Sequence, residues 1–296
     1  MYLLLDHQPP SILTIVLTVA NNLDGSLPSE LGLLTDIQVL FLWSEANLVG
    51  LLPDTLKNLG QLRVIETQSS NLSGSIPDWI GQWSSIEFMS FSANLFDGPL
   101  PASLSSLTAL LLFAVDSNVM TGDLSALAGS TSLTSLYLED NYFLDTLNNT
   151  FLQNLEKLRV LDISDNNLAG QVPVHLMGLT TLQTMDINGN NLTQFPDSIP
   201  ANGTIDFLAV YDNPITGLFP SNTIRNLEAL DHLDLTSTEF TGGMPTVLGG
   251  MRKLSYLFLA DTCFNAGSIP NEYQHLTNLL DLSLKHSGRT GVSTRR

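Results

Sequence analysis

The side chains most capable of chemistry in this 296-residue chain are carboxylates that recur at nearly equal spacing. Asp162 and Asp186 lie 24 residues apart, and Asp116 and Glu139 precede them at intervals of 23 residues. In register on neighbouring strands, the two aspartates would lie about 4.8 Å apart. Carboxylates this close can raise each other's pKa, and they match the roughly 5 Å separation of a retaining glycosidase pair. A cation site, a site for a Lys or Arg side chain, and a solvated acidic strip are the alternatives.

These carboxylates follow a repeat of about 24 residues that runs through almost the whole chain. Its clearest copy reads Leu161-x-Ile163-x-x-Asn166-x-Leu168-x-Gly170-x-Val172-Pro173. We call the first apolar residue of each copy the first anchor and the residue two places later the second anchor. A period this regular predicts a solenoid. The first anchors are Leu17, Leu40, Ile65, Met89, Phe113, Leu136, Leu161, Met185, Leu208, Leu233, Leu257 and Leu282.

Residue types predict the path of each coil. The two anchors and the residue between them form a short strand, with the anchors turned inward and the intervening residue outward. Asn recurs five residues after the first anchor, as at Asn94 and Asn166, where its amide can bond backbone groups that the turn leaves unpaired. Thr238, Thr262 and Ser70 replace it, and a hydroxyl satisfies fewer partners. A Gly such as Gly98 then permits a tight bend, and a Pro precedes a short 3₁₀ or helical turn.

The motif resembles the plant-type extracellular leucine-rich repeat found in receptor kinases, receptor-like proteins and polygalacturonase-inhibiting proteins. The match covers roughly residues 12–284, and the Gly-x-Ile-Pro half, as in Gly74 to Pro77 and Gly267 to Pro270, is specific to this subtype. The resemblance implies a right-handed superhelix with a parallel β-sheet on its concave face. It also implies a second, smaller strand after the Asn turn, and short 3₁₀ turns and loops on the convex face.

The chain departs from this family pattern in two ways. Plant ectodomains carry paired cysteines in a cap at each end, whereas Cys263 is the only cysteine here. The copy at Leu192 to Pro196 lacks the Gly, and its turn is one residue short.

Length and pattern predict a single elongated domain, because a solenoid has no central core that stops growing with length. We expect a truncated N-terminal flank at 1–11, about eleven repeats and a partial last one at 12–284, and a basic C-terminal tail at 285–296. The net charge is −18, and residues 1–284 hold 7 basic and 29 acidic side chains, a net charge of −22. This charge disfavours nucleic acid as a partner and favours a basic protein, a peptide or a cation.

The outward positions of successive strands should line up in three rows on the concave face. The first row precedes the first anchor, the second lies between the anchors, and the third follows the second anchor. Aromatic and acidic residues are grouped in these rows, as expected for a protein or peptide recognition surface. The groups are an apolar and aromatic N-terminal quarter, an acidic middle made of Asp116, Glu139, Asp162 and Asp186, and an aromatic C-terminal patch made of Phe207, Tyr211, Tyr256 and Phe258. The predicted ligand-binding residues are Phe88, Phe207 and Tyr256 of the first row, Phe41, Glu66, Tyr137, Asp162, Asp186, Asp234 and Phe258 of the second, and Trp43, Asp116, Glu139 and Tyr211 of the third.

Catalysis is not expected from these residues. An open sheet excludes no water and offers no pocket that would raise the pKa of a catalytic acid. The chain has no phosphate loop, no G-x-S-x-G and no H-E-x-x-H, and its five histidines have no metal-ligand spacing. We therefore predict a protein that is not an enzyme and has neither a cofactor nor a metal site.

Four sequons, at Asn71, Asn148, Asn191 and Asn202, favour an extracellular or cell-surface location. With the family resemblance, they predict a non-enzymatic recognition module, the ectodomain of a receptor-like or adhesion protein that binds a protein or peptide. Membrane attachment would require a segment outside this chain. A soluble secreted inhibitor and a structural surface protein are the alternatives, and the ligand and oligomeric state stay open.

Overall fold

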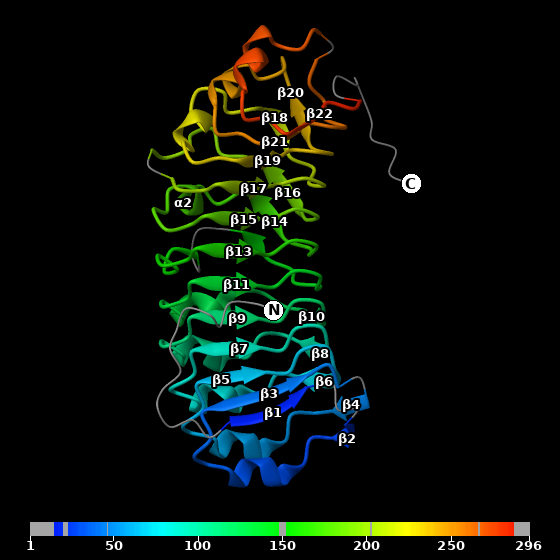
Figure 1. Ribbon diagram of the computed structural model, residues 1–296, viewed down its shortest axis with the longest axis vertical. Coiled ribbons are helices and arrows are strands. Elements are labelled where there is room, and N and C mark those ends of the chain that lie inside the picture. Colours follow the sequence, from blue (N-terminus) through cyan, green and yellow to red (C-terminus); the bar gives the residue numbers. More distant parts are fainter. Residues whose placement is uncertain are drawn as a thin grey trace.

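Each repeat folds into one coil, and the coils stack into an elongated solenoid (Figure 1). The computed structural model describes residues 15–19, 23–45, 47–147, 152–201, 203–265 and 267–286. The predicted N-terminal flank 1–11 and residues 287–296 of the predicted tail lie outside the described residues.

The described residues include a main sheet of twelve parallel strands that follow one another in chain order. From Leu40 onward, the register places every first anchor beside the next, as in Leu136, Leu161 and Met185. The anchor predicted for the first repeat is wrong by one residue, because Val16 pairs with Leu40 whereas Leu17 pairs with Phe41. The strands are β1 (Ile15–Val19), β3 (Val39–Trp43), β5 (Val64–Glu66), β7 (Phe88–Ser90), β9 (Leu112–Ala114), β11 (Ser135–Tyr137), β13 (Val160–Asp162), β15 (Thr184–Asp186), β17 (Phe207–Ala209), β19 (His232–Asp234), β21 (Tyr256–Phe258) and β22 (Asp281–Ser283).

Most of these strands begin one residue earlier than the sequence predicts, at the residue before the first anchor. Hydrogen bonds between coils nevertheless continue past the strand ends, because the Leu138 N–H donates to the Asp162 carbonyl at 2.9 Å and the Asp140 N–H to the Ser164 carbonyl at 3.2 Å. The three rows therefore stay aligned beyond the strands.

Two five-stranded lateral sheets supply the second strand that the family resemblance implies. Where the copy at Leu192 to Pro196 is one residue short, the pairing of β14 with β16 shifts register, and β16 pairs with β18 only between Gln194 and Thr216. One lateral sheet contains β2 (Asp24–Ser26), β4 (Asn47–Gly50), β6 (Asn71–Ser75), β8 (Leu95–Gly98) and β10 (Val119–Met120), and the other β12 (Thr146–Leu147), β14 (Ala169–Gln171), β16 (Asn191–Gln194), β18 (Thr216–Leu218) and β20 (Glu239–Thr241).

Short helical turns return the chain from the lateral strands to the main sheet, which confirms the predicted 3₁₀ turns. A Pro precedes most of them and accepts their first hydrogen bond, as in the Leu56 N–H to Pro53 carbonyl bond of 3.0 Å. The turns are η1 (Ser29–Leu33), η2 (Asp54–Asn58), η3 (Asp78–Gln82), η4 (Ala102–Ser106), η5 (Ser125–Gly129), α2 (Val174–Met177), η6 (Ile224–Asn226), η7 (Thr246–Gly250) and η8 (Asn271–His275).

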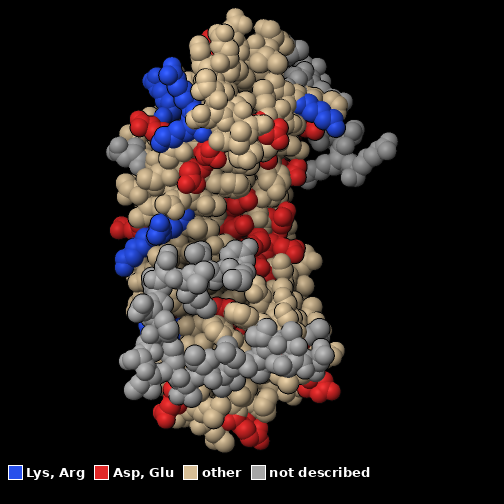
Figure 2. All heavy atoms as spheres, in the orientation of Figure 1, with Lys and Arg blue, Asp and Glu red and all other residues tan. Residues whose placement is uncertain are grey.

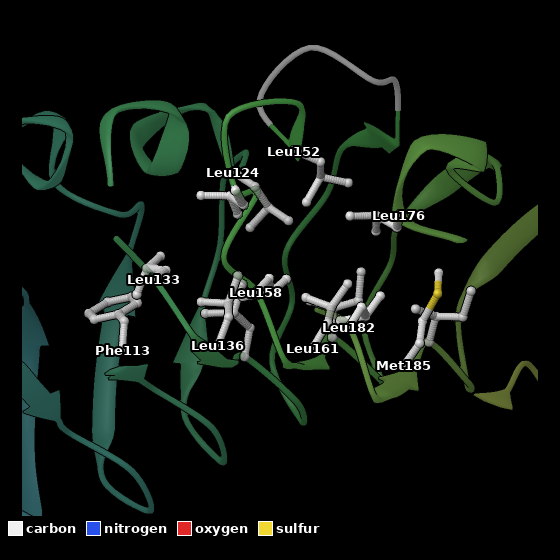
Figure 3. Packing of buried hydrophobic residues seen from close by; sticks show 14 of the residues in the cluster. Phe113, Leu124, Leu133, Leu136, Leu152, Leu158, Leu161, Leu176, Leu182 and Met185 are labelled. Carbon is white, nitrogen blue, oxygen red and sulfur yellow. The ribbon is translucent and has the colours of Figure 1, made fainter. Parts of the chain in front are cut away.

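The core is one continuous apolar column along the solenoid axis. Figure 3 shows the first anchors Leu136, Leu161 and Met185 beneath Leu124 and Leu176 of the convex turns. The first anchors from Leu40 to Leu257 are fully buried, as predicted, whereas the last one, Leu282, is 37% exposed because no described coil covers it. Removing a buried leucine side chain from such a core typically costs about 2–5 kcal/mol.

The predicted asparagine ladder joins each coil to the one before it. Asn166 is buried, and its Nδ2 donates to the Leu138 carbonyl of the preceding coil at 2.9 Å and to the Ser164 carbonyl at 2.9 Å. Its Oδ1 accepts the Phe143 N–H of the preceding coil at 3.0 Å. Asn94, Asn118, Asn141, Asn190 and Asn213 repeat this pattern. One side chain thus satisfies both polar groups that the turn would otherwise orphan.

Hydroxyls satisfy fewer groups at the ladder positions where they replace Asn, as predicted. Thr238 Oγ1 donates only to the Leu235 carbonyl, at 2.6 Å, and the buried Ser70 hydroxyl has no partner among the described residues. The preceding coils compensate with local backbone bonds: the Ile215 N–H donates to the Asn213 carbonyl at 2.8 Å, and the Leu48 N–H to the Glu45 carbonyl at 2.8 Å.

Two left-handed residues bend most coils. Most glycines of the repeat have positive φ, including +71° at Gly98 and +96° at Gly170, which confirms the predicted tight bend there, whereas Gly267 does not have a positive φ. The residue before the ladder position also has positive φ, and it is usually Ser or Asp, such as Ser117 (53°) and Asp165 (49°). This second bend was not predicted from the sequence, although short polar residues tolerate the left-handed region best after glycine.

The ladder predicts the effect of removing one asparagine. Asn166→Ala should lower the free energy of unfolding by about 1–3 kcal/mol, because the buried Phe143 N–H and Leu138 carbonyl lose their partner. Chemical denaturation monitored by circular dichroism measures the loss. The matched control is Asn167→Ala at the exposed neighbour, and equal stability of the two variants would contradict a structural role for the ladder.

Candidate recognition surface

The fourteen predicted ligand-binding residues all lie on the concave face, and each is half-buried. Strand register confirms the second row, because Tyr137 pairs with Asp162 and Asp162 with Asp186. The third row continues the same stacking, since the Ser117 N–H donates to the Glu139 carbonyl at 2.9 Å. Residues about 24 positions apart in the chain are therefore neighbours on one surface.

The middle of this face holds an acidic strip made of Asp116, Glu139, Asp162 and Asp186. Figure 2 shows acidic side chains gathered across the middle of the solenoid. Three of the four carboxylates accept hydrogen bonds from small polar side chains. Ser92 donates to Asp116, Ser164 to Asp162 at 2.6 Å, and the amide of Asn188 to Asp186.

A short sequence motif explains how several of these carboxylates are held. An Asp in the second row is followed two residues later by Ser, Asn or Thr, and the backbone N–H of that residue donates to the carboxylate. The N–H to oxygen distances are 3.1 Å from Ser164 to Asp162, 3.3 Å from Asn188 to Asp186 and 2.8 Å from Thr236 to Asp234. Such local bonds orient each carboxylate and leave its other oxygen for a ligand.

Burial raises the pKa of every carboxyl in the strip. The pKa of Glu139 rises to about 8, chiefly by desolvation and then by repulsion from Asp162, Asp116 and Asp186. The pKa of Asp186 rises to about 6, again by desolvation first and by Asp162 second. The prediction that an open sheet cannot raise a carboxyl pKa is therefore wrong, because tightly stacked neighbouring rows exclude much of the water around each group.

An aromatic platform, made of Phe207, His232, Tyr256 and Phe258, follows the acidic strip along the solenoid axis. Phe207 and His232 stack with ring centroids 4.4 Å apart and planes inclined by 23°. His232 also lies 5.5 Å from Tyr256 and 5.4 Å from Phe258, measured between ring centroids. His232 was not among the predicted binding residues, although it occupies the first row between Phe207 and Tyr256. Burial lowers its pKa, so the ring is predominantly neutral at pH 7.

Tyr211 was predicted to belong with the aromatic residues, but the structure places it beside the acidic strip. Among the described residues, no aromatic ring pair includes Tyr211. Desolvation raises the pKa of its hydroxyl to about 12, and the negative charge of Asp186 is the next cause. Tyr211 therefore borders both regions.

The N-terminal part of the face is a separate aromatic group. Phe41 and Trp43 have ring centroids 4.8 Å apart. Burial raises the pKa of the neighbouring Glu66 to about 7. Phe88 lies in the first row on β7, closer along the solenoid to this group than to the platform.

Comparison with known proteins agrees with this geometry. The leucine rich repeat family model matches residues 131–192. The chain is 30% identical to Receptor-like protein 41 and 31% identical to Receptor-like protein 39, both of Arabidopsis thaliana, in each case over 161 residues that are 54% of this chain. It resembles the ectodomain of the Arabidopsis thaliana receptor kinase GASSHO1/SCHENGEN3, with a TM-score of 0.84, 29% identity and 90% of this chain covered.

The chain has the fold of a leucine-rich repeat solenoid. It spans 18% of the length of these two receptor-like proteins and 32% of the GASSHO1/SCHENGEN3 chain. A TDR receptor structure matches 94% of this chain and 48% of its own with a TM-score of 0.85, and its 23% identity supports the fold alone.

Two of the four sequons of this leucine-rich repeat chain lie in the described residues. Asn71 and Asn191 are the first residues of lateral strands β6 and β16, and both side chains are exposed. They occupy equivalent places in their repeats, away from the concave face. Asn148 and Asn202 lie outside the described residues.

The described residues contain no group of three or more His, Cys, Asp or Glu side chains placed to hold a metal ion. The side chains of the concave face can form hydrogen bonds, ionic contacts and aromatic contacts. These are the interactions of a recognition surface.

The raised pKa of Glu139 predicts a pH-dependent stability. An unfolded glutamate has a pKa near 4.5, so between pH 4.5 and 8 the folded protein keeps a proton that the unfolded chain releases. The free energy of unfolding should therefore fall as pH rises through this window. Glu139→Gln should flatten the fall, as measured by denaturant titrations at pH 5, 6.5 and 8. Glu156→Gln, at an exposed position outside the sheet, should keep the wild-type profile, and identical profiles for all three proteins would contradict burial of Glu139.

Proposed function

We propose that this chain is a non-enzymatic extracellular recognition module, part of the ectodomain of a receptor-like or adhesion protein, which binds a protein or peptide on its concave face. The observation that carries the proposal is the acidic strip placed directly beside an aromatic platform on one continuous sheet. The platform supplies apolar contact area, and the strip supplies charge that selects the partner.

The aromatic side chains support binding because their placement is ordered. Phe207, His232 and Tyr256 are the first-row residues of three successive strands, β17, β19 and β21. Their contacts hold the rings in fixed orientations, so little side-chain entropy is lost when a partner packs against them. Scattered exposed aromatics would lack this order.

The relatives support a receptor-like role. The first curated matches are receptor-like proteins, and the GASSHO1/SCHENGEN3 ectodomain structure is a complex with CASPARIAN STRIP INTEGRITY FACTOR 2. None of the helices in the described part of this chain has the length and hydrophobicity needed to cross a bilayer.

A non-enzymatic role also fits the state of the carboxylates. The aspartates in register, Asp162 and Asp186, each use one oxygen to accept bonds from their own strand continuation. The resulting surface is a row of fixed hydrogen-bond acceptors along an open sheet. Such a row suits the binding of a ligand's hydrogen-bond donors better than the proton transfer of glycoside hydrolysis.

The concave face can be tested with a library of random 12-residue peptides displayed on phage. We expect selection on the immobilised protein to enrich peptides whose affinity falls at least ten-fold in the double variant Asp162→Ala with Asp186→Ala, because the variant removes two acidic-strip charges. The control is Glu156→Ala with Glu228→Ala, which removes the same charge from exposed positions outside the sheet. Selected peptides that bind both double variants equally would contradict concave-face recognition.

The extracellular location predicts glycans on the lateral face. Expressed through a eukaryotic secretory pathway, the protein should lose mass on treatment with an N-glycosidase, and Asn71→Gln and Asn191→Gln should each remove one glycan. Exposure of both side chains gives the transferase access. Intact-mass spectrometry measures the change, Asn167→Gln serves as a control outside any sequon, and an unmodified secreted protein would contradict the assignment of these sites.

A further inference from the structure

The acidic strip contains buried side-chain oxygens that have no hydrogen-bond partner among the described residues. Asn188 is only 3% exposed, and its amide nitrogen donates to Asp186. Its Oδ1 has no partner among the described residues, and the same holds for the buried Oε2 of Glu139. Both residues lie in the third row on the concave face, with Ser164 between them. A buried polar atom without a partner is destabilising, so two of them in one row, two coils apart, indicate a site that is completed by a ligand.

The charges around these two atoms are all of one sign. Within the described residues, the groups that act on the Glu139 carboxyl are Asp162, Asp116 and Asp186. Those that act on Asp186 are Asp162 and Asp165. Tyr211 follows Asn188 in the third row, one coil further along, and lies in the negative field of Asp186, Asp165, Asp234 and Asp212. Among the described residues, no Lys or Arg is among the groups that act on Glu139, Asp186 or Tyr211, so the missing partner should carry positive charge.

The aromatic platform lies a fixed distance away along the solenoid axis. Three strand-to-strand steps separate Asp162 on β13 from His232 on β19, through β15 and β17. Each step is about 4.8 Å, so the separation is about 14 Å. An extended peptide rises about 3.4 Å per residue, and about four residues span this distance. Because side chains alternate, residues i and i+4 project from the same side of such a peptide.

We propose that the concave face binds an extended peptide segment whose Lys or Arg side chain donates to Glu139, Asn188 and the flanking aspartates, and whose aromatic or large apolar side chain, four residues away, packs on the platform of Phe207, His232 and Tyr256. This inference rests on the proposed function, because it assigns the ligand chemistry of the same face. The peptide runs along the solenoid axis and crosses the strands, so side chains carry the recognition. The strip attracts the cation, and the platform sets the spacing.

Binding of a cation should couple to a proton. Glu139, whose pKa is about 8, is mostly protonated at pH 7, and a bound ammonium or guanidinium favours its ionised form. The bound complex therefore releases up to one proton, and affinity should rise between pH 6 and 8 by up to about ten-fold per pH unit. Asp186, with a pKa of about 6, contributes mainly at the lower end of this range.

The experiment uses the peptides selected from the random 12-residue display library on the immobilised full chain. Sequencing should show a Lys or Arg and an aromatic or large apolar residue four positions apart. In the best binder, synthesised with citrulline replacing Arg or acetyl-lysine replacing Lys, affinity should fall at least ten-fold. Glu139→Gln and, independently, Asn188→Ala should weaken binding of the parent peptide, and Glu139→Gln should also remove most of the rise between pH 6 and 8. Glu156→Gln should change neither property.

The outcomes separate this inference from the proposed function. Selected peptides that lose affinity in Asp162→Ala with Asp186→Ala, yet lack a basic residue or tolerate its neutralisation, would overturn the cationic anchor and leave concave-face recognition standing. A basic residue without the spaced apolar partner, or an affinity that does not change between pH 6 and 8, would also overturn the inference. A selection that yields no peptide sensitive to any concave variant would overturn both.

Discussion

The stacking of identical coils at one pitch is the constraint on which the rest of this structure depends. The backbone leaves each strand through a left-handed residue. Without a side-chain partner, one backbone N–H and one carbonyl would have no hydrogen bond at each turn. The asparagine ladder satisfies both groups by bonding to the preceding coil, as Asn166 does with Phe143 and Leu138. Because the bond joins neighbouring coils, it fixes local geometry and pitch together. Apolar anchors such as Leu161 then fill the space within the stack.

The same stacking gives the concave face its negative electrostatic potential and raises the pKa of its carboxyls. Residues in equivalent places are forced to within one strand spacing, so carboxylates such as Asp162 and Asp186 cannot separate. Their neighbours exclude water, and the pKa values of Glu139 and Asp186 rise as a result. A compact globular protein would relieve this repulsion with a nearby Lys or Arg. Here the described strip retains free acceptors, which is the arrangement expected of a surface that receives its positive charge from a partner.

Much of this surface could be predicted from the sequence because the repeat converts chain position into spatial position. The period placed Tyr137, Asp162 and Asp186 side by side, and the register confirms it. It could not reveal rotamers. Tyr211 was grouped with the aromatic residues by proximity along the chain, yet it lies in the negative field of Asp186. His232 lies in the first row but was left out of the predicted binding residues, whereas its stacking on Phe207 makes it part of the platform.

By itself, the sequence determined the solenoid, the buried anchors, the ladder and the rows, because each depends only on residue type and on a period of about 24. The tertiary structure alone decided how far each row is shielded from water, which oxygens find donors, and which rings touch. Those properties arise from side chains of several coils acting together, as at Glu139, where three other carboxylates on the same face act on one group. Shielding from water and missing hydrogen-bond partners arise where side chains of several coils pack together, so they cannot be read from the sequence of a single repeat.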